Sequence, residues 1–446
     1  MRQHASIVIR QRATQAVRVI RQRATQAVRV VRQRATQAVR VVRQSATQAV
    51  RVVRQRASRF ARWFMASPRR RRGLRWTLYA AGGLAGVVIL YLALTPTGHY
   101  LVRAGWEEAK ILARRRGIVR MAADSSVPPA TRKKLQLVLD ARAFARDSLD
   151  LDVGRSFATF SQLDSDTLVL VLSAAYRDRL KNVTWWFPIV GSVPYKGYFD
   201  FAAAQGAERD FQSRGFDNYL RPASAFSTLG WFNDPLVSST LRADTLTLAN
   251  TVIHELTHNT FYAPGQAEFN ESFANFVGAR GSAEFFRSRG QPAAVEEADA
   301  RWSDEKLLAR FWKQLYNDID STFQAHPGDT ASHTRLALRD SIFVAARSDL
   351  VFRLGPLLRT IAPRYVERVR LDNAALMARR IYLTDLDLFD SVYVREGRST
   401  RRAVQRVVAL AKSDEKHPYD ALRRWVGGAL AVTGGRGGGS GKPAAQ

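Results

Sequence analysis

Two histidines and a glutamate in the middle of the chain have the types and spacing of a metal site. His254 and His258 lie four residues apart in the segment VIHELTHNT, so on a helix they project from one face and can both reach one metal ion. Glu255 lies beside them, placed to accept a proton from a water that the metal activates. The chain has only seven histidines, so this H-E-x-x-H pattern is expected by chance in roughly one such protein in a hundred or fewer.

A pair of histidines needs a third protein ligand, with one position left open for water. Glu271, in the segment FNESFANF, is the best placed, because a Pro-Gly turn returns a second helix antiparallel to the first. Glu268 is the rival ligand, although it falls on another side of that helix. Asn275, one turn beyond Glu271, is a candidate partner for a ligand histidine. Taken singly, each histidine is better explained as a core residue; together with Glu271 they favour one zinc ion (Zn²⁺).

Helical periodicity dominates the segment that must position this motif, from Thr97 to about Leu430. Apolar residues recur at spacings of three and four in five stretches, whereas strand-like stretches are fewer. We therefore expect a mainly helical α+β domain with one small mixed or antiparallel sheet. The Gly-, Pro- and aromatic-rich segment Phe187–Asp200 is expected to form a shaped loop. The predicted helices are Trp106–Met121, Pro129–Leu149, Lys306–Phe323, His333–Phe352 and Arg364–Tyr382, and the predicted strands are Thr167–Leu172, Thr184–Val190 and Ser224–Trp231.

An apolar segment precedes that domain. No charged residue occurs from Trp76 to Gly98, a stretch long enough to cross a bilayer core of about 30 Å. Arginines concentrated in residues 65–75 precede it, so the positive-inside rule keeps this flank in the cytoplasm and exports the domain on the other side of the segment. A cleaved signal peptide competes but lacks a small-x-small cleavage site, and flanking arginines argue against a buried core helix. We expect residues 76–96 to form one transmembrane signal-anchor helix.

The net charge of +30 is concentrated at the N-terminus. Residues 1–64 hold 16 arginines and no acidic residue, which leaves +14 for the rest of the chain. Eleven-residue repeats such as VIRQRATQAVR fill this segment. Three interpretations compete: a basic amphipathic helix on anionic lipid, a nucleic-acid tail, and a duplicated DNA segment translated from a start codon upstream of Met65. We favour the third and expect no nucleic-acid partner. At the other end, residues 431–446 are expected to be a Gly-rich flexible tail.

Beyond the motif, the sequence resembles a bacterial family of predicted zinc aminopeptidases, with thermolysin-like HExxH and NExFA elements. The resemblance covers about three quarters of the chain, residues 97–430. It is carried by His99–Ile118, Leu137–Leu151, Trp185–Asp200, Ala225–Leu241, Val252–Tyr262, Phe269–Gly278 and Leu371–Tyr382.

The resemblance implies a zincin-like metallopeptidase domain on the periplasmic side of the inner membrane. It implies His254, His258 and Glu271 as zinc ligands and Glu255 as the catalytic base. Family members often carry a lipid-modified cysteine just before the position of His99. This chain has no cysteine, so the apolar helix must supply the anchor, and disulfides, a cysteine nucleophile and cysteine metal ligands are excluded. The arginine repeat has no counterpart in the family.

Peptide hydrolysis also needs a donor to the tetrahedral oxyanion. Tyr195 and Tyr198 in the PYKGY segment are the first candidates, followed by Tyr262 and His417. An aminopeptidase further needs a carboxylate that holds the free amine of its substrate. The candidates for that role are Glu268, Asp200 and Asp234.

The sequence thus favours a membrane-anchored, zinc-dependent aminopeptidase acting on peptide substrates. An endopeptidase or an amidase of cell-wall peptides would use the same zinc chemistry. A non-catalytic, membrane-anchored zinc-binding protein is the alternative from another class, and Glu255 argues against it, because a structural metal site needs no base.

Overall fold

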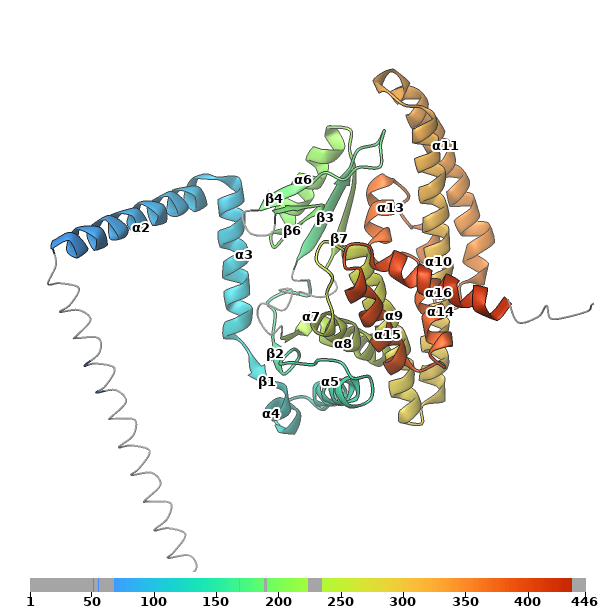
Figure 1. Ribbon diagram of the computed structural model, residues 1–446, viewed down its shortest axis with the longest axis horizontal. Coiled ribbons are helices and arrows are strands. Elements are labelled where there is room, and N and C mark those ends of the chain that lie inside the picture. Colours follow the sequence, from blue (N-terminus) through green and yellow to red (C-terminus); the bar gives the residue numbers. More distant parts are fainter. Residues whose placement is uncertain are drawn as a thin grey trace, which may run out of the picture. The chain divides into compact units, whose positions relative to one another are not determined.

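The computed structural model of the protein divides into two units, Met1–Gly98 and His99–Gln446 (Figure 1). Most of the repeat in residues 1–64, most of the tail in residues 431–446 and the predicted strand Ser224–Trp231 lie outside the described residues. The residues that the structure describes are 51, 55, 68–167, 169–187, 191–223 and 235–434.

The first unit contains helix α2 (Pro68–Leu94). Its apolar part, Trp76–Leu94, has 19 residues with a mean hydropathy of 1.9, and none of that part is buried against the protein. By length and composition, this helix could therefore cross a membrane.

The second unit is mainly helical, as predicted, and its core surrounds the pair α8 and α9. Helices α5 and α10 pack against this pair. Phe273 and Phe276 of α9 stack on Phe389 of α14, with ring centroids 5.9 and 5.8 Å apart. The helices that matter here are α3 (Pro96–Ala113), α4 (Ile118–Ala123), α5 (Pro129–Asp147), α6 (Phe201–Ser213), α7 (Ser238–Leu241), α8 (Thr245–Thr260), α9 (Ala267–Ser288), α10 (Pro292–Ala325), α11 (Ser332–Ser348), α12 (Pro363–Glu367), α13 (Asn373–Arg380), α14 (Leu386–Arg395), α15 (Thr400–Ser413) and α16 (Pro418–Gly434).

Two helices predicted to be continuous are each interrupted. The predicted helix Trp106–Met121 breaks because Arg116 and Gly117 form strand β1, which pairs with strand β2 (Thr159–Ser161). The buried Ile118 then starts α4. The predicted helix Arg364–Tyr382 is split into α12 and α13. Asp372 starts the second part by accepting a hydrogen bond from the amide of Ala375 at 2.8 Å, as an N-cap residue does.

The single sheet that we predicted is replaced, in the described residues, by three small sheets. The segment expected to be one loop, Phe187–Asp200, instead contributes to two of them, because it makes a hairpin and then a strand of the central sheet. The sheets are β1–β2–β8 (Arg116–Gly117, Thr159–Ser161, Leu236–Val237), β6–β3–β7 (Tyr195–Tyr198, Leu170–Ala175, Asp217–Pro222) and the hairpin β4–β5 (Trp185–Phe187, Gly191–Val193).

Helices α6 and α13 pack against the antiparallel sheet β6–β3–β7, on opposite faces (Figure 1). Ser173 pairs with Tyr195 and Tyr219, and Val171 pairs with Arg221, so these side chains share one face of the sheet. Helix α13 lies against this face, where Arg379 donates to the Tyr219 hydroxyl at 3.3 Å. On the opposite face, Leu172, Tyr198 and Leu220 pack near Phe211 of α6, and Lys196 lies over the Tyr198 ring.

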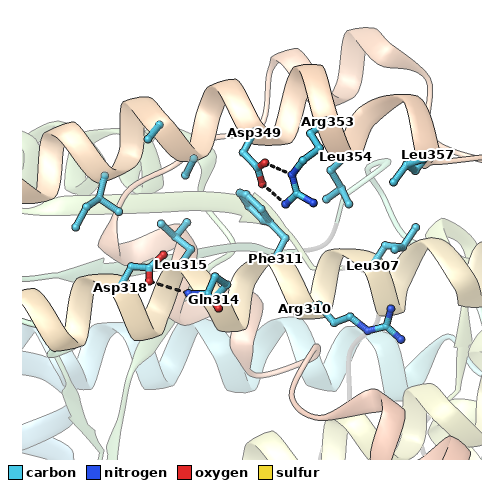
Figure 2. A pocket seen from close by; sticks show the side chains of 13 residues that line it. Leu307, Arg310, Phe311, Gln314, Leu315, Asp318, Asp349, Arg353, Leu354 and Leu357 are labelled. Atoms are coloured by element: carbon cyan, nitrogen blue, oxygen red, sulfur yellow. Dashed lines mark hydrogen bonds and ion pairs between the residues drawn. The ribbon is translucent and has the colours of Figure 1, made fainter.

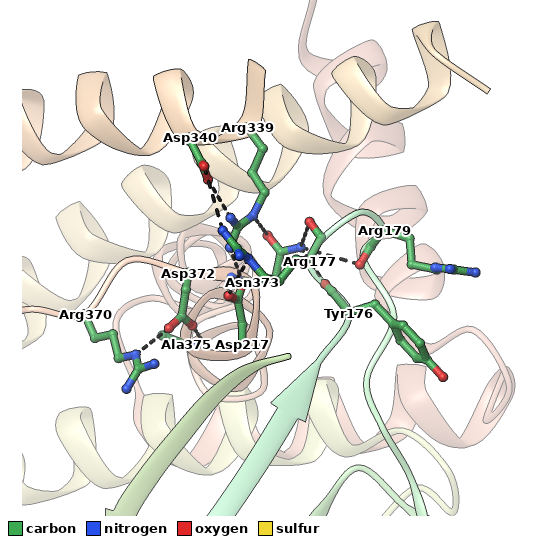
Figure 3. Close-up of polar contacts among 10 residues, drawn as sticks. All are labelled: Tyr176, Arg177, Arg179, Asp217, Arg339, Asp340, Arg370, Asp372, Asn373 and Ala375. Carbon is green, nitrogen blue, oxygen red and sulfur yellow. Dashed lines mark hydrogen bonds and ion pairs between the residues drawn. The ribbon is translucent and has the colours of Figure 1, made fainter. Parts of the chain in front are cut away.

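A buried polar network fixes α11 and α13 to the end of this sheet (Figure 3). Arg339 of α11 is only 3% exposed and forms an ion pair with Asp217, the first residue of β7. The same carboxylate accepts a hydrogen bond from the amide of Asn373 at 2.9 Å, and the Asn373 side chain donates to the Tyr176 carbonyl at 2.8 Å. This network sets α13, and the residues directly after it, against β7.

A cavity of about 620 Å³ lies between α10 and the helical segment α11–η2, where η2 is the π-helical turn Asp349–Leu354 (Figure 2). Its floor is apolar, with Leu307, Phe311 and Leu354, and its rim carries ion-paired Asp349 and Arg353. None of the residues in the H-E-x-x-H motif lines it.

A second polar centre makes the stability of the fold depend on pH. Asp390 of α14 accepts hydrogen bonds from Arg280 of α9 at 2.8 Å, from Trp302 of α10 at 3.1 Å and from Lys306 of α10. Burial favours the neutral acid, but the charges of Arg280 and Lys306 outweigh it and lower the pKa of Asp390. Because the folded pKa lies below the unfolded one, this stabilisation is present above about pH 4 and is lost as the pH falls further.

We expect Asp390→Asn to lower the free energy of unfolding by about 3 kcal/mol at pH 7, because it leaves Lys306 without a counter-charge and Arg280 with only the half-exposed Asp299. Denaturant unfolding between pH 7 and pH 3 measures this free energy, and the gap between the values of variant and wild type should narrow as the pH drops below about 4. The control is Asp387→Asn on the same helix, whose exposed pair with Arg310 contributes less than about 1 kcal/mol. A gap that is independent of pH would contradict the electrostatic explanation.

Candidate metal centre

Helix α8 presents the two histidines on one face. Asp244 caps its start by accepting a hydrogen bond from the amide of Thr247 at 2.8 Å. Val252, Ile253 and Leu256 are fully buried and hold the helix in the core. His254 and His258 lie one turn apart with ring centroids 5.0 Å from each other.

Helix α9 brings Glu271 to that face. The Asn270 side chain closes the turn between the two helices, since it accepts from the amide of Ala263 at 2.9 Å and donates to the carbonyl of the same residue at 2.8 Å. Gly278 lets the helices approach, because a Cβ there would lie 2.9 Å from Asn250 Oδ1 and 3.2 Å from the Cβ of His254. The residue after Asn270 is therefore held facing α8.

The three side chains converge on one point. His254 Nε2 lies 3.4 Å from Glu271 Oε2, and His258 Nε2 lies 3.6 Å from Glu271 Oε1. All ligand atoms of this group lie within 4.8 Å of one another. Bonds of about 2.1 Å at tetrahedral angles separate ligand atoms by about 3.4 Å. Two imidazoles and a carboxylate at this spacing therefore fit a zinc ion, and no other such group of three occurs in the described residues.

The charges of the group already suit a cation. Burial favours a neutral His254, but the hydrogen bond with Glu271 and the charges of Glu255, Glu271 and Glu305 raise its pKa. Burial and the charge of His254 lower the pKa of His258 to about 4. Burial opposes ionisation of Glu271, whereas His254, His258 and Arg221 together lower its pKa. Glu271 is thus an ionised carboxylate beside the neutral imidazole of His258, and both can donate a lone pair to a metal ion.

The charge of Glu255 acts both on a candidate ligand and on a tyrosine that the sequence did not single out. This charge raises the pKa of His254 and of Tyr382, the second residue after α13. Asn275 holds that tyrosine in place, because its side chain donates to the Tyr382 carbonyl at 2.7 Å rather than to a ligand histidine.

Three tyrosines lie near the group: Tyr195 on β6, Tyr262 just after α8 and Tyr382 just after α13. Burial and the charge of Glu271 raise the pKa values of Tyr382 and Tyr262, and the same two causes, with neighbouring tyrosines, raise that of Tyr195. All three therefore stay protonated and can donate. Tyr262 also lies beside His258, with ring centroids 6.5 Å apart. Tyr198 is not brought to the group: it is three residues from Tyr195 on the same strand, points to the other face and packs near Phe211.

The remaining candidates have other partners. Glu268 pairs with Arg380 at 3.6 Å, His417 pairs with Asp414 at 3.4 Å, and Asp200 caps α6 by accepting from the amide of Ala203 at 3.0 Å. Asp234 lies outside the described residues.

Sequence reasoning missed three residues that the fold brings to the site: Tyr382, Arg221 and Glu305. Burial raises the pKa of Glu305 to about 7, while His254 and Arg301 oppose this rise. Glu305 was missed because α10 begins at Pro292, well before the predicted start at Lys306. Tyr382 could have been found from the sequence, because it ends Leu371–Tyr382, one of the segments that carry the family resemblance.

One comparison with known proteins gives a match over most of the chain. A family model described as "Putative aminopeptidase" matches residues 99–422, which include the three converging side chains and Glu255. No curated protein and no solved structure matches the chain.

Proposed function

Because the chain belongs to the putative aminopeptidase family and is therefore a hydrolase of the peptidase class, we propose that it is a zinc-dependent aminopeptidase with a zincin-like catalytic domain. One observation carries the zinc dependence: His254, His258 and Glu271 place their ligand atoms within 4.8 Å of one another. Glu255, the neighbour of His254 in the chain, supplies the base that a purely structural site would not need.

Bound zinc supplies Lewis acidity, polarising the scissile carbonyl and lowering the pKa of the attacking water. His254, His258 and Glu271 hold the ion, and the fixed packing of α8 on α9 keeps their spacing. Glu255 accepts the proton of the water and then delivers it to the departing amine.

Tyr382 is the best-supported donor to the oxyanion. Arg221 donates to its hydroxyl oxygen at 3.5 Å, which leaves the phenolic proton available for another acceptor. Its raised pKa keeps that proton in place, and the charges of Glu271 and Glu255 both act on it. Tyr195, the candidate from the sequence, lies on the same side but is 45% exposed.

We expect Tyr382→Phe to lower kcat by roughly 10²- to 10³-fold with little change in KM, since an oxyanion donor acts mainly in the transition state. Tyr195→Phe is the matched control from the same side of the site, and we expect it to lose less than about 10-fold. Steady-state kinetics on one peptide would decide between them, and the reverse order would assign the role to Tyr195.

Helix α2 supports a membrane-anchored form of this enzyme. Its apolar part is long enough to span a bilayer, and Arg69–Arg72 precede it. By the positive-inside rule, the arginines stay in the cytoplasm and the catalytic unit lies on the periplasmic side of the inner membrane.

An endopeptidase is the second candidate, and one observation favours it. Neither Glu268 nor Asp200, the described candidates for holding a free amine, joins the metal-binding group. The test uses the full chain in detergent with zinc and one peptide mixture in free and N-acetylated forms. An aminopeptidase removes single residues from the free peptides only, an endopeptidase cuts both, and hydrolysis of neither form would refute the peptidase proposal.

A further inference from the structure

Arg221 is a cation beside the metal-binding group, and the proposed chemistry uses only its contact with the Tyr382 hydroxyl. It extends from β7 on the same face of the sheet as Tyr195, as the pairing of both strands with β3 requires. Its guanidinium lies 5.5 Å from the ring centroid of Tyr382, and its Nη2 lies 3.5 Å from the tyrosine hydroxyl. Strand pairing and this aromatic contact therefore hold the charge close to the site.

Within the described residues, Arg221 has no carboxylate partner at ion-pair distance, and neither has Arg379 of α13, which donates to the Tyr219 hydroxyl on the same face of the sheet. The arginines near Asp217, at the start of β7, do have such partners. Arg339 pairs with Asp217, and Arg370 pairs with Asp372. To the residues that the structure describes, the Arg221 side chain donates one hydrogen bond, which is long and uses one of its five N–H donors. Four donors in a planar fork remain for an anion, and such a fork matches a carboxylate in two-point contact.

The charge of Arg221 reaches the reacting groups. It lowers the pKa of Glu271 and counteracts the rise in the pKa values of Tyr195 and Tyr382. Glu271 is not its partner, because both carboxylate oxygens of Glu271 face the histidines. An anion that binds the Arg221 guanidinium is therefore not part of the metal-binding group.

We propose that Arg221 binds a carboxylate of the peptide substrate, close to the bond that is hydrolysed. This inference rests on the proposed function. A carboxylate near the reacting bond is either the C-terminus of a short peptide or an acidic side chain beside the cleaved bond. Both offer the same planar pair of oxygens to the guanidinium. The two sources can be distinguished by peptides that carry the charge at only one of these positions.

The test compares matched peptides on the full chain in detergent, loaded with zinc. The first pair is a dipeptide with a free or an amidated C-terminus, and the second pair is an amidated peptide with Glu or Gln beside the cleaved bond. We expect a preference of roughly 10- to 100-fold in kcat/KM for the charged member of one pair, since a hydrogen bond to a charged group has about that effect.

Arg221→Gln should reduce that preference to less than about 3-fold, and Arg221→Lys should restore part of it. Loss of Tyr382 positioning alone would slow both members of a pair equally and leave their ratio unchanged. The control is Arg214→Gln, which replaces an exposed arginine that contacts Phe211 on the other side of the sheet. If the preference within the first pair depends on Arg221, the residue binds the C-terminal carboxylate. If the preference within the second pair does, it binds the acidic side chain.

A binding measurement separates this inference from the proposed function. Titration calorimetry on zinc-loaded Glu255→Gln, with and without Arg221→Gln, reports affinity for the same peptides without turnover. If Arg221→Gln weakens the binding of the charged peptides only, the inference is supported, whether or not the wild type hydrolyses them. If the wild type hydrolyses none of them, the peptidase proposal alone is refuted. Peptides that are hydrolysed and bound regardless of charge would overturn the inference and leave the peptidase proposal standing.

Discussion

Glu255→Gln is expected to lower kcat for peptide hydrolysis by roughly 10²- to 10⁴-fold, because glutamine cannot accept the proton of the attacking water. Glutamine has almost the same shape, and Glu255 is not among the converging metal-binding side chains. We therefore expect the variant to bind zinc as the wild type does. Kinetics on one peptide, together with metal analysis of the same samples, measure both effects.

The control for Glu255 is Glu296→Gln on α10, an exposed carboxylate paired with Arg359. It should leave both kcat and zinc content unchanged. If fully zinc-loaded Glu255→Gln kept more than about a tenth of the wild-type kcat, another group would have to act as the base.

Glu271→Ala is expected to weaken zinc binding by more than about 100-fold, since loss of a residue that merely supports a ligand already costs 10- to 100-fold. The two histidines that remain come from one helix and cannot enclose the ion. Activity at limiting zinc should fall to background. Competition with a chelator of known affinity measures the change.

The chain offers a matched control on the same helix. Glu268 lies three residues before Glu271 and is held by Arg380 and Thr384 instead of by the histidines. Glu268→Ala should keep its zinc affinity within a factor of about 3. If Glu268→Ala lost zinc while Glu271→Ala kept it, Glu268 and not Glu271 would be the metal ligand.

The convergence of His254, His258 and Glu271 was predictable because its geometry is local. Spacing along one helix brings His254 to His258, and a short turn returns Glu271 to them. The mainly helical character was likewise readable from periodicity. What periodicity did not show were interruptions such as β1, where pairing with a distant strand overrides the helical pattern of Trp106–Met121.

The residues around the ligands were not predictable because distant segments position them. Arg221 reaches the site through the pairing of β7 with β3, and Tyr382 through the attachment of α13 to Asp217. Tyr195 and Tyr198 looked equivalent in the sequence, and only their strand assignment separates them, since residues three apart on a strand point to opposite faces.

The measurement that tests zinc-dependent catalysis most directly is a zinc titration of the full chain after removal of metal by a chelator. Hydrolysis of a peptide with a free N-terminus should rise in proportion to added zinc and stop rising at one ion per chain, as expected for two histidines and one glutamate around one open position. Hydrolysis that persists in the chelator, or that does not depend on added zinc, would contradict a catalytic role for His254, His258 and Glu271.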